Sequence, residues 1–331
     1  MKVIIDNAIP FIHGIVEPWA EVVYCSGSDI NREVVRDADA LIVRTRTQCN
    51  KELLEGSTVQ FIATATIGRD HIDEAYCKGA GIEVASAAGC NARGVLQWVA
   101  AALKQIVIKD GKRPEDYTLG VVGVGNVGSL VVEYARHWGF NVLMCDPPRH
   151  EREGGDFLLL DTIAQQTDII TFHTPLDATT HHMLNDRLLA TMHPNAVIIN
   201  ASRGGVVDNI AVANSSHRYA FDVWEGEPNI NPIVLNNAML ATPHIAGYSR
   251  QGKANATSMV INALSHHFSL PLTNWYPADS HPTTPRLISW NELCETIDSY
   301  CSIKEETEVL KSSLEAFESL RNNYNYREEY F

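Results

Sequence analysis

Short apolar runs rich in β-branched residues alternate with helix-length segments along most of the chain, and this alternation restricts the fold more than any other feature. Continuous apolar strands separated by helices are typical of parallel sheets that are covered on both faces. We therefore predict an α/β protein with two doubly wound parallel-sheet domains. The expected strands of the first domain are residues 2–6, 20–25, 39–44, 60–66 and 82–87, and those of the second are 119–124, 141–146, 168–173, 196–201, 219–224 and 238–242.

A glycine cluster follows the first expected strand of the second domain. Gly123, Gly125 and Gly128 precede an amphipathic segment with helical spacing, and Asp146 ends the next expected strand. Such glycines allow a tight turn, close approach of the backbone to a pyrophosphate and close packing of helix on strand. An acidic residue at this distance accepts hydrogen bonds from the ribose hydroxyls. The charge of Asp146 would repel the 2′-phosphate of NADP, so we predict NAD, although two arginines that follow Asp146 weaken this exclusion.

The composition narrows the possible functions. A net charge of −14 over 331 residues argues against nucleic acids and anionic membranes as partners. No stretch approaches the roughly 18 apolar residues of a membrane span, and the N-terminus lacks a signal-like apolar region, so we expect a cytoplasmic protein. The cysteines are scattered without a C-x-x-C pair, which favours free thiols. The pairs at 181–182 and 266–267 are adjacent histidines without a carboxylate or cysteine at metal-site spacing, so we predict no metal.

Three further segments shape the expected organisation. Residues 91–111 are apolar nearly all round, which predicts a long helix buried between domains or in the interface of a homodimer. Residues 253–268 predict an amphipathic helix, and the proline-rich residues 270–285 predict a stiff linker without helix. The tail, residues 308–331, is expected to form a small module with its own helix. One face of that helix would carry Leu310, Leu314, Phe317 and Leu320.

Three loops carry the candidate catalytic residues. Arg203, Glu227 and His244 each come shortly after an expected strand. Loops at the carboxyl ends of parallel strands gather at one edge of the sheet and build sites there. These three side chains are therefore expected to converge.

On these residues the chain resembles the D-isomer-specific 2-hydroxyacid dehydrogenases. In that family the nucleotide domain is inserted into the first domain, which explains the late glycine loop. The resemblance implies a flavodoxin-like substrate domain of residues 1–92 and 247–270, a Rossmann NAD-binding domain of residues 93–246, and a linker with a C-terminal, dimerising module of residues 271–331. It is carried by "GVVGVGNVG", "FHTPLDATTHHMLN", "NASRGGVVD", "DVWEGEP" and "HIAGY".

The resemblance also implies the roles of the site residues. Arg203 would bind the substrate carboxylate through its guanidinium fork. His244 would exchange a proton with the C2 hydroxyl, and Glu227 would fix its tautomer and stabilise the imidazolium. Hydride would pass directly between C2 and the nicotinamide. The expected cofactor contacts are Gly123, Gly125, Asn126, Val127, Gly128, Asp146, Thr174, Asp222 and Gly247.

A narrower resemblance, to a branch of the family that acts on a phosphorylated hydroxy acid, rests on "LMCDPPR", "EGGDF" and the tail "FESLRNNYNYREE". It implies substrate contacts from Thr45, Thr66 and Tyr248, with Arg44 and Arg69 as further phosphate ligands. "VRTRT" departs from the pattern of this branch and leaves the phosphate contacts open. Two alternatives also stay open: a dehydrogenase for 3-phosphoglycerate or glyoxylate and hydroxypyruvate, and a dinucleotide-sensing corepressor that works by binding.

Overall fold

The computed structural model describes residues 1–331 and divides into two compact units. The first comprises Met1–Asn91 and Arg250–Pro282, and the second comprises Ala92–Ser249 and Thr283–Phe331. Residues 271–331 were expected to form a third module, and here the structure differs. Their first part belongs to the first unit, and the remainder lies in the second because its apolar residues are buried in that unit's cores.

The first unit contains a five-stranded parallel sheet in the order β2-β1-β3-β4-β5, the flavodoxin-like order. Its strands coincide with the five apolar runs, so this part of the predicted fold is confirmed. They are β1 (Lys2–Asp6), β2 (Glu21–Cys25), β3 (Ala40–Val43), β4 (Phe61–Thr64) and β5 (Glu83–Ser86).

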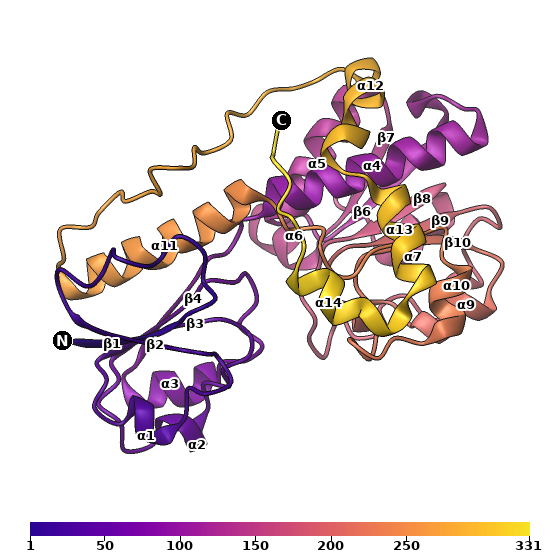
Figure 1. The fold of residues 1–331 in the computed structure, drawn as a ribbon. Coiled ribbons are helices and arrows are strands. Elements are labelled where there is room, and N and C mark those ends of the chain that lie inside the picture. The colour runs from indigo at the N-terminus through magenta and orange to yellow at the C-terminus, as the bar shows by residue number, and fades with distance from the viewer. The chain divides into compact units, whose positions relative to one another are not determined.

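Helices cover both faces of this sheet (Figure 1). Alternate residues of β3 face opposite ways: Ala40 packs in one core and Leu41 in the other. The long helix α11 (Arg250–Phe268) supplies Val260 and Ile261 to the first core. The other core is covered by three short helices, α1 (Arg32–Val35), α2 (Lys51–Leu54) and α3 (Glu74–Ala80).

The second unit contains a six-stranded parallel sheet in the order β11-β10-β9-β8-β6-β7. A single bridge between Met144 and Phe157 adds a further pairing beside β7, where the Rossmann order has its third strand. The strand order reverses between β7 and β8, on either side of β6, so a ligand crevice is expected at the carboxyl ends of these strands. The six strands, all predicted, are β6 (Thr118–Val122), β7 (Asn141–Cys145), β8 (Ile169–Phe172), β9 (Val197–Asn200), β10 (Arg218–Phe221) and β11 (Leu240–Ala241).

Two layers of helices bury the two faces of this second sheet. The unit's helices are α4 (Ala92–Asp110), α5 (Asn126–Trp138), α6 (Pro147–Glu153), α7 (Leu160–Gln166), α8 (Asp186–Leu189), α9 (Asn209–Asn214), α10 (Pro232–Asn237), α12 (Trp290–Tyr300), α13 (Ile303–Ser312) and α14 (Phe317–Asn322), and all of them except α6 contribute buried residues. None of the chain's helices combines the length and the apolar character that crossing a bilayer requires.

The chain's own tail covers the long helix α4. Helices α5, α12 and α13 pack on it. Lys104 pairs with Asp298 of α12 at 2.7 Å, and Gln97 bonds the backbone of Glu328 and Tyr330. The predicted helix is therefore confirmed, but its apolar surface is buried within one unit.

The tail helix differs from the prediction. The chain breaks at Ser313, where φ is −148° and ψ is 73°, and a short 3-10 turn of Leu314–Ala316 separates α13 from α14. Leu310 and Phe317 are nevertheless both fully buried in one core of the second unit. The apolar spacing predicted burial correctly and helix continuity wrongly.

If the tail is part of that core, Phe317→Ala should lower the free energy of unfolding by about 3 kcal/mol, the usual cost of emptying a buried aromatic site. Urea unfolding followed by tryptophan fluorescence measures this change. Ile233→Ala on α10 is the control, because Ile233 is 62% exposed and should change stability by less than about 0.5 kcal/mol. Equal effects of the two variants would contradict the assignment of the tail to the core.

Candidate functional site

Two of the predicted catalytic side chains contact each other directly. Nδ1 of His244 lies 2.7 Å from Oε2 of Glu227, and the amide of Trp224 donates to Oε1 of the same carboxylate at 2.8 Å. The backbone of His244 is in the left-handed region, with φ of 59°. The carboxylate is thus held by the backbone on one side and holds the imidazole with its other oxygen.

The charge state of Glu227 follows from its surroundings. Burial by itself would raise the pKa of this carboxyl. The charge and hydrogen bond of His244, the Trp224 amide and the nearby guanidinium of Arg321 outweigh burial, so the pKa of Glu227 lies below its ordinary value. The carboxylate therefore stays ionised next to the imidazole.

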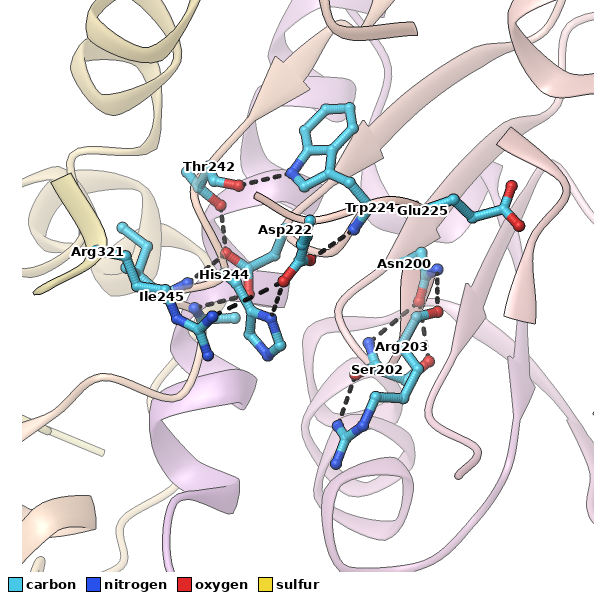
Figure 2. Close-up of polar contacts among 12 residues, drawn as sticks. Asn200, Ser202, Arg203, Asp222, Trp224, Glu225, Thr242, His244, Ile245 and Arg321 are labelled. Atoms are coloured by element: carbon cyan, nitrogen blue, oxygen red, sulfur yellow. Dashed lines mark hydrogen bonds and ion pairs between the residues drawn. The ribbon is translucent and has the colours of Figure 1, made fainter. Parts of the chain in front are cut away.

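Asp222 anchors the loop that carries His244 (Figure 2). Its buried carboxylate accepts hydrogen bonds from the Thr242 hydroxyl at 2.6 Å and from the amides of Ile245 and Ala246 at 2.7 and 2.9 Å. The indole of Trp98 in turn donates to the Thr242 hydroxyl at 2.9 Å. Burial raises the pKa of Asp222. Asp222 was predicted only as a cofactor contact, and its role as an anchor was missed.

The loop of Arg203 is fixed to the neighbouring strand. Asn200, the last residue of β9, accepts from the amide and hydroxyl of Ser202 and donates to the carbonyl of Arg203. A Cβ on Gly204 would lie 2.1 Å from the Trp224 carbonyl, so only glycine fits there. Because β9, β10 and β11 are adjacent in the sheet, the loops of Arg203, Glu227 and His244 all leave one edge. In this structure the Arg203 guanidinium donates to the Ser202 carbonyl at 2.8 Å, so its convergence on the other two side chains stays a prediction.

The glycine loop has the geometry of a dinucleotide turn. Gly123 has φ of +83°, and a Cβ on it would lie 2.8 Å from the His173 backbone. A Cβ on Gly128 would lie 1.9 Å from the Gly123 carbonyl oxygen. Helix α5 begins at Asn126 without a side-chain cap, so its first amides face outward without a protein acceptor. These features fit a bound pyrophosphate.

Two buried polar atoms beside this turn lack a protein partner, the Thr174 hydroxyl oxygen and Nδ1 of His173. Burial lowers the pKa of His173 to about 3, so its imidazole is neutral, and its Nε2 lies 3.0 Å from the Thr171 hydroxyl. Unpaired buried polar atoms cost free energy unless a ligand or water meets them. The residues present therefore fit NAD at this position.

Asp146 lies against the glycine turn. Its two carboxylate oxygens accept from the amides of Val124 and Arg149 at 2.8 and 2.9 Å. The Arg149 side chain, which could have favoured NADP, is bound to Glu153 and to the Val124 carbonyl at 2.8 and 2.7 Å. The arginine is thus engaged by the protein itself. Of the other expected cofactor contacts, Val127 lies in the first turn of α5, and Gly247 lies in the loop after His244.

The expected substrate contacts lie in both units. In the first, Arg44 forms a two-bond pair with the buried Asp6, with bonds of 3.0 and 3.2 Å, and Thr45 is exposed. The Thr66 hydroxyl bonds Thr64 and the Gly68 carbonyl. In the second unit the Tyr248 hydroxyl accepts from Nε of Arg321 at 3.2 Å.

Arg69, the further phosphate candidate, is engaged by Ser86 and Glu74.

One pair of adjacent histidines does have a carboxylate nearby, although no acidic residue stands at metal-site spacing from it in the sequence. Ligand atoms of His181, His182 and Glu225 lie within 4.8 Å of one another. Nε2 of His182 lies 2.6 Å from a carboxylate oxygen of Glu225, so these two side chains already satisfy each other by a hydrogen bond.

Sequence reasoning missed the tail residues that reach the His244 loop. The buried Arg327 donates to the carbonyls of Ile245, Ala246 and Gly94. Glu329 accepts from Ser249 at 2.6 Å. The sequence does contain a signal, the dense run of arginine, tyrosine and glutamate in "RNNYNYREEY". Charged residues are almost never fully buried unless they are paired, so such a run in a segment expected to pack on the protein indicates specific polar contacts.

Comparison with known proteins places the chain in a family. It is 45% identical to an erythronate-4-phosphate dehydrogenase of Bacteroides thetaiotaomicron, over 99% of this chain and 97% of that one. The chain belongs to the erythronate-4-phosphate dehydrogenase family. A second family member, from Ectopseudomonas mendocina, is 43% identical over 82% of this chain and 73% of its own. Residues 96–246 match the model of the D-isomer specific 2-hydroxyacid dehydrogenase, NAD binding domain.

Solved structures of other proteins have the same fold as this chain. D-lactate dehydrogenase from Aquifex aeolicus, complexed with NAD and lactic acid, has a TM-score of 0.69 at 23% identity and covers 85% of this chain and 100% of its own. NAD-bound 3-phosphoglycerate dehydrogenase from Entamoeba histolytica has a TM-score of 0.67 at 24% identity, with 85% and 99% covered. The cofactor is NAD, as the glycine loop predicted.

The lowered pKa of Glu227 makes a prediction about stability and pH. Because the folded pKa lies below the unfolded value of about 4.3, the ionised carboxylate contributes stability that is present above pH ~4.3 and lost as pH falls through the folded value. The unfolding free energy of Glu227→Gln should therefore change less than that of the unmodified chain between about pH 6 and pH 3. Urea titrations across this range measure it. Asp156→Asn, at an exposed acid, should follow the unmodified chain.

Proposed function

We propose that this chain oxidises 4-phospho-D-erythronate to 2-oxo-3-hydroxy-4-phosphobutanoate with NAD, a step in making pyridoxal 5′-phosphate. The observation that carries the proposal is the Glu227–His244 pair in an NAD-binding domain, whose loops leave the same sheet edge as the loop of Arg203. The choice of substrate is supported by the relatives named erythronate-4-phosphate dehydrogenase, which match nearly the whole chain.

The geometry of the pair supports a proposal for the direction in which the proton moves. Nδ1 of His244 donates to Glu227, which leaves Nε2 as the basic nitrogen. During oxidation Nε2 takes the proton of the C2 hydroxyl, and the ionised Glu227 stabilises the imidazolium that results. Arg203 binds the C1 carboxylate with its guanidinium fork and keeps C2 in place. NAD, when bound, supplies the acceptor for the hydride that leaves C2.

The cofactor would be held by backbone and by a few polar groups. The first amides of α5, at Asn126 and Val127, would meet the pyrophosphate. Asp146 would accept from the ribose hydroxyls with the lone pairs that its two amide partners leave open. Thr174 would give its unpartnered hydroxyl to the cofactor. Asp222 and Gly247 complete the proposed contacts.

In the first unit, Thr45, Thr66 and Arg44 are the proposed contacts for the phosphate of the substrate; in the second unit, Tyr248 is a proposed substrate contact. Asp6 uses two of the five guanidinium N–H groups of Arg44, so the others stay available. The buried carboxylate also fixes the direction of the Arg44 side chain. This supports Arg44 as an oriented donor for an anion.

A homodimer and a cytoplasmic location also belong to the proposal. Helix α4 does not support the dimer, because its apolar residues are buried in the second unit. The tail exposes Tyr300, Val309 and Tyr326, and these are the surfaces we propose for the contact. All seven cysteines are free thiols, which is consistent with a reducing compartment.

If 4-phospho-D-erythronate is the substrate, its kcat/KM should exceed that of D-erythronate by about 100-fold or more. D-erythronate lacks the phosphate, so the hydrogen-bond donors that bind this group would be left unpaired. Steady-state NADH formation over a panel with D-glycerate, D-lactate and 3-phosphoglycerate measures it. Equal values with and without the phosphate would refute the phosphate pocket. A preference for 3-phosphoglycerate would favour the rival dehydrogenase.

His244→Ala is the control in that assay. Turnover should fall by about 100-fold or more, the usual contribution of a general base, while affinity for NAD is kept. A chain that works only by sensing the dinucleotide would bind NAD and show no turnover even before the substitution.

The choice of NAD is predicted to depend on Asp146. Asp146→Ser keeps an acceptor at the start of α6 but removes the charge. The Kd for NAD should rise about tenfold, and the preference for NAD over NADP should narrow. Calorimetric titration with both cofactors measures the two values. Asp156→Ser, at an exposed acid of the same unit, should leave both unchanged, and an unaltered NAD preference in Asp146→Ser would place ribose recognition elsewhere.

A further inference from the structure

Helix α14 of the tail places a guanidinium at the proposed acid–base pair. Nε of Arg321 donates to the Tyr248 hydroxyl at 3.2 Å, and its NH1 lies 3.8 Å from Oε2 of Glu227. That oxygen is the one that accepts from His244. One tail residue therefore touches both a proposed substrate contact and the partner of the proposed base.

We propose that Arg321 is a positioning residue of the reaction, which sets the proton affinity of the Glu227–His244 pair and orients Tyr248. The inference rests on the proposed function, because it deepens the same site. Arg321 acts through its neighbours and takes up no proton itself.

The electrostatic part of the argument concerns a single oxygen. A cation beside Oε2 stabilises the ionised carboxylate without the help of a protonated imidazole. The carboxylate then draws less strongly on the proton that it shares with the imidazole, so the cation lowers the proton affinity of the pair as a whole. The charged groups that face the pair are Asp222 after β10 and Arg321 from α14, and the titratable Tyr248, four residues after His244, contacts Arg321. Asp222 acts in the opposite sense to Arg321.

The packing part of the argument concerns the tail itself. Phe317, at the start of α14, is 1% exposed and holds the helix in the core. The ring of Tyr248 contacts those of Tyr324 and Tyr326 edge-on, with centroids 6.1 and 6.0 Å apart. The hydroxyl and the ring of Tyr248 are thus both held by the tail, so the guanidinium has a fixed position relative to the loop.

The decisive variants separate charge from hydrogen bonding. Arg321→Met removes both, Arg321→Lys keeps the charge, and Tyr248→Phe removes only the bonded hydroxyl. Arg321→Gln is a second neutral variant should Met prevent folding. Lys304→Met removes a charge from an exposed position of the same tail and is the control.

We expect Arg321→Met to move the acidic limb of the kcat/KM profile to higher pH by about one unit, which is the low end of the effect of a charge at this distance. Arg321→Lys should restore the limb but keep a raised KM, and Tyr248→Phe should raise KM without moving the limb. Lys304→Met should match the unmodified chain. A purely structural role of Arg321 would lower thermal stability and leave the limb in place.

A second readout needs neither substrate nor cofactor. The imidazole carbon resonances follow the titration of the Glu227–His244 pair in the free protein, and its midpoint should also rise in Arg321→Met and Arg321→Gln. If the unmodified chain fails to oxidise 4-phospho-D-erythronate while this midpoint still moves, the proposed function fails and the role of Arg321 stands. An unmoved midpoint in both neutral variants would overturn the inference.

Discussion

The site of the second unit depends on the hydrogen bonds that the buried carboxylate of Asp222 accepts from the loop of His244. A buried charge is costly unless donors meet it, and here a hydroxyl and two amides of one loop do so. Hydrogen bonds to a charged group contribute about 1.5–3 kcal/mol each, which outweighs the roughly 1–3 kcal/mol of a residue in a sparsely populated backbone region. His244 can therefore sit at φ of 59° and stay aimed at Glu227.

Close backbone approaches then fix the loops to one another. The Arg203 loop meets the Trp224 carbonyl through Gly204, and the first turn of α5 meets the Gly123 carbonyl through Gly128. At both points a side chain would overlap the neighbouring backbone. These glycines are required by contact distance, so substitution would separate the loops rather than stiffen them.

Much of this arrangement could be predicted from local pattern. In β9, Val197 and Ile199 enter one core and Ile198 the other, so the strand had to be apolar throughout, and all eleven strands were found for that reason. The convergence of the three site loops follows from strand adjacency. The tail was harder. Its apolar spacing placed Leu310 and Phe317 in the core but did not report the break between them, because a helix can end without changing which residues are buried.

What no local pattern reports is how the tail completes the site. The amides of Ile245 and Ala246 donate to Asp222, and the carbonyls of the same two residues accept from Arg327. Two backbone residues thus lie between a buried anion and a buried cation, with their dipoles aligned to both. Each charge lowers the cost of burying the other through the backbone between them. The cation comes from Arg327 of the tail, so the tail is part of what holds the loop of His244 in place.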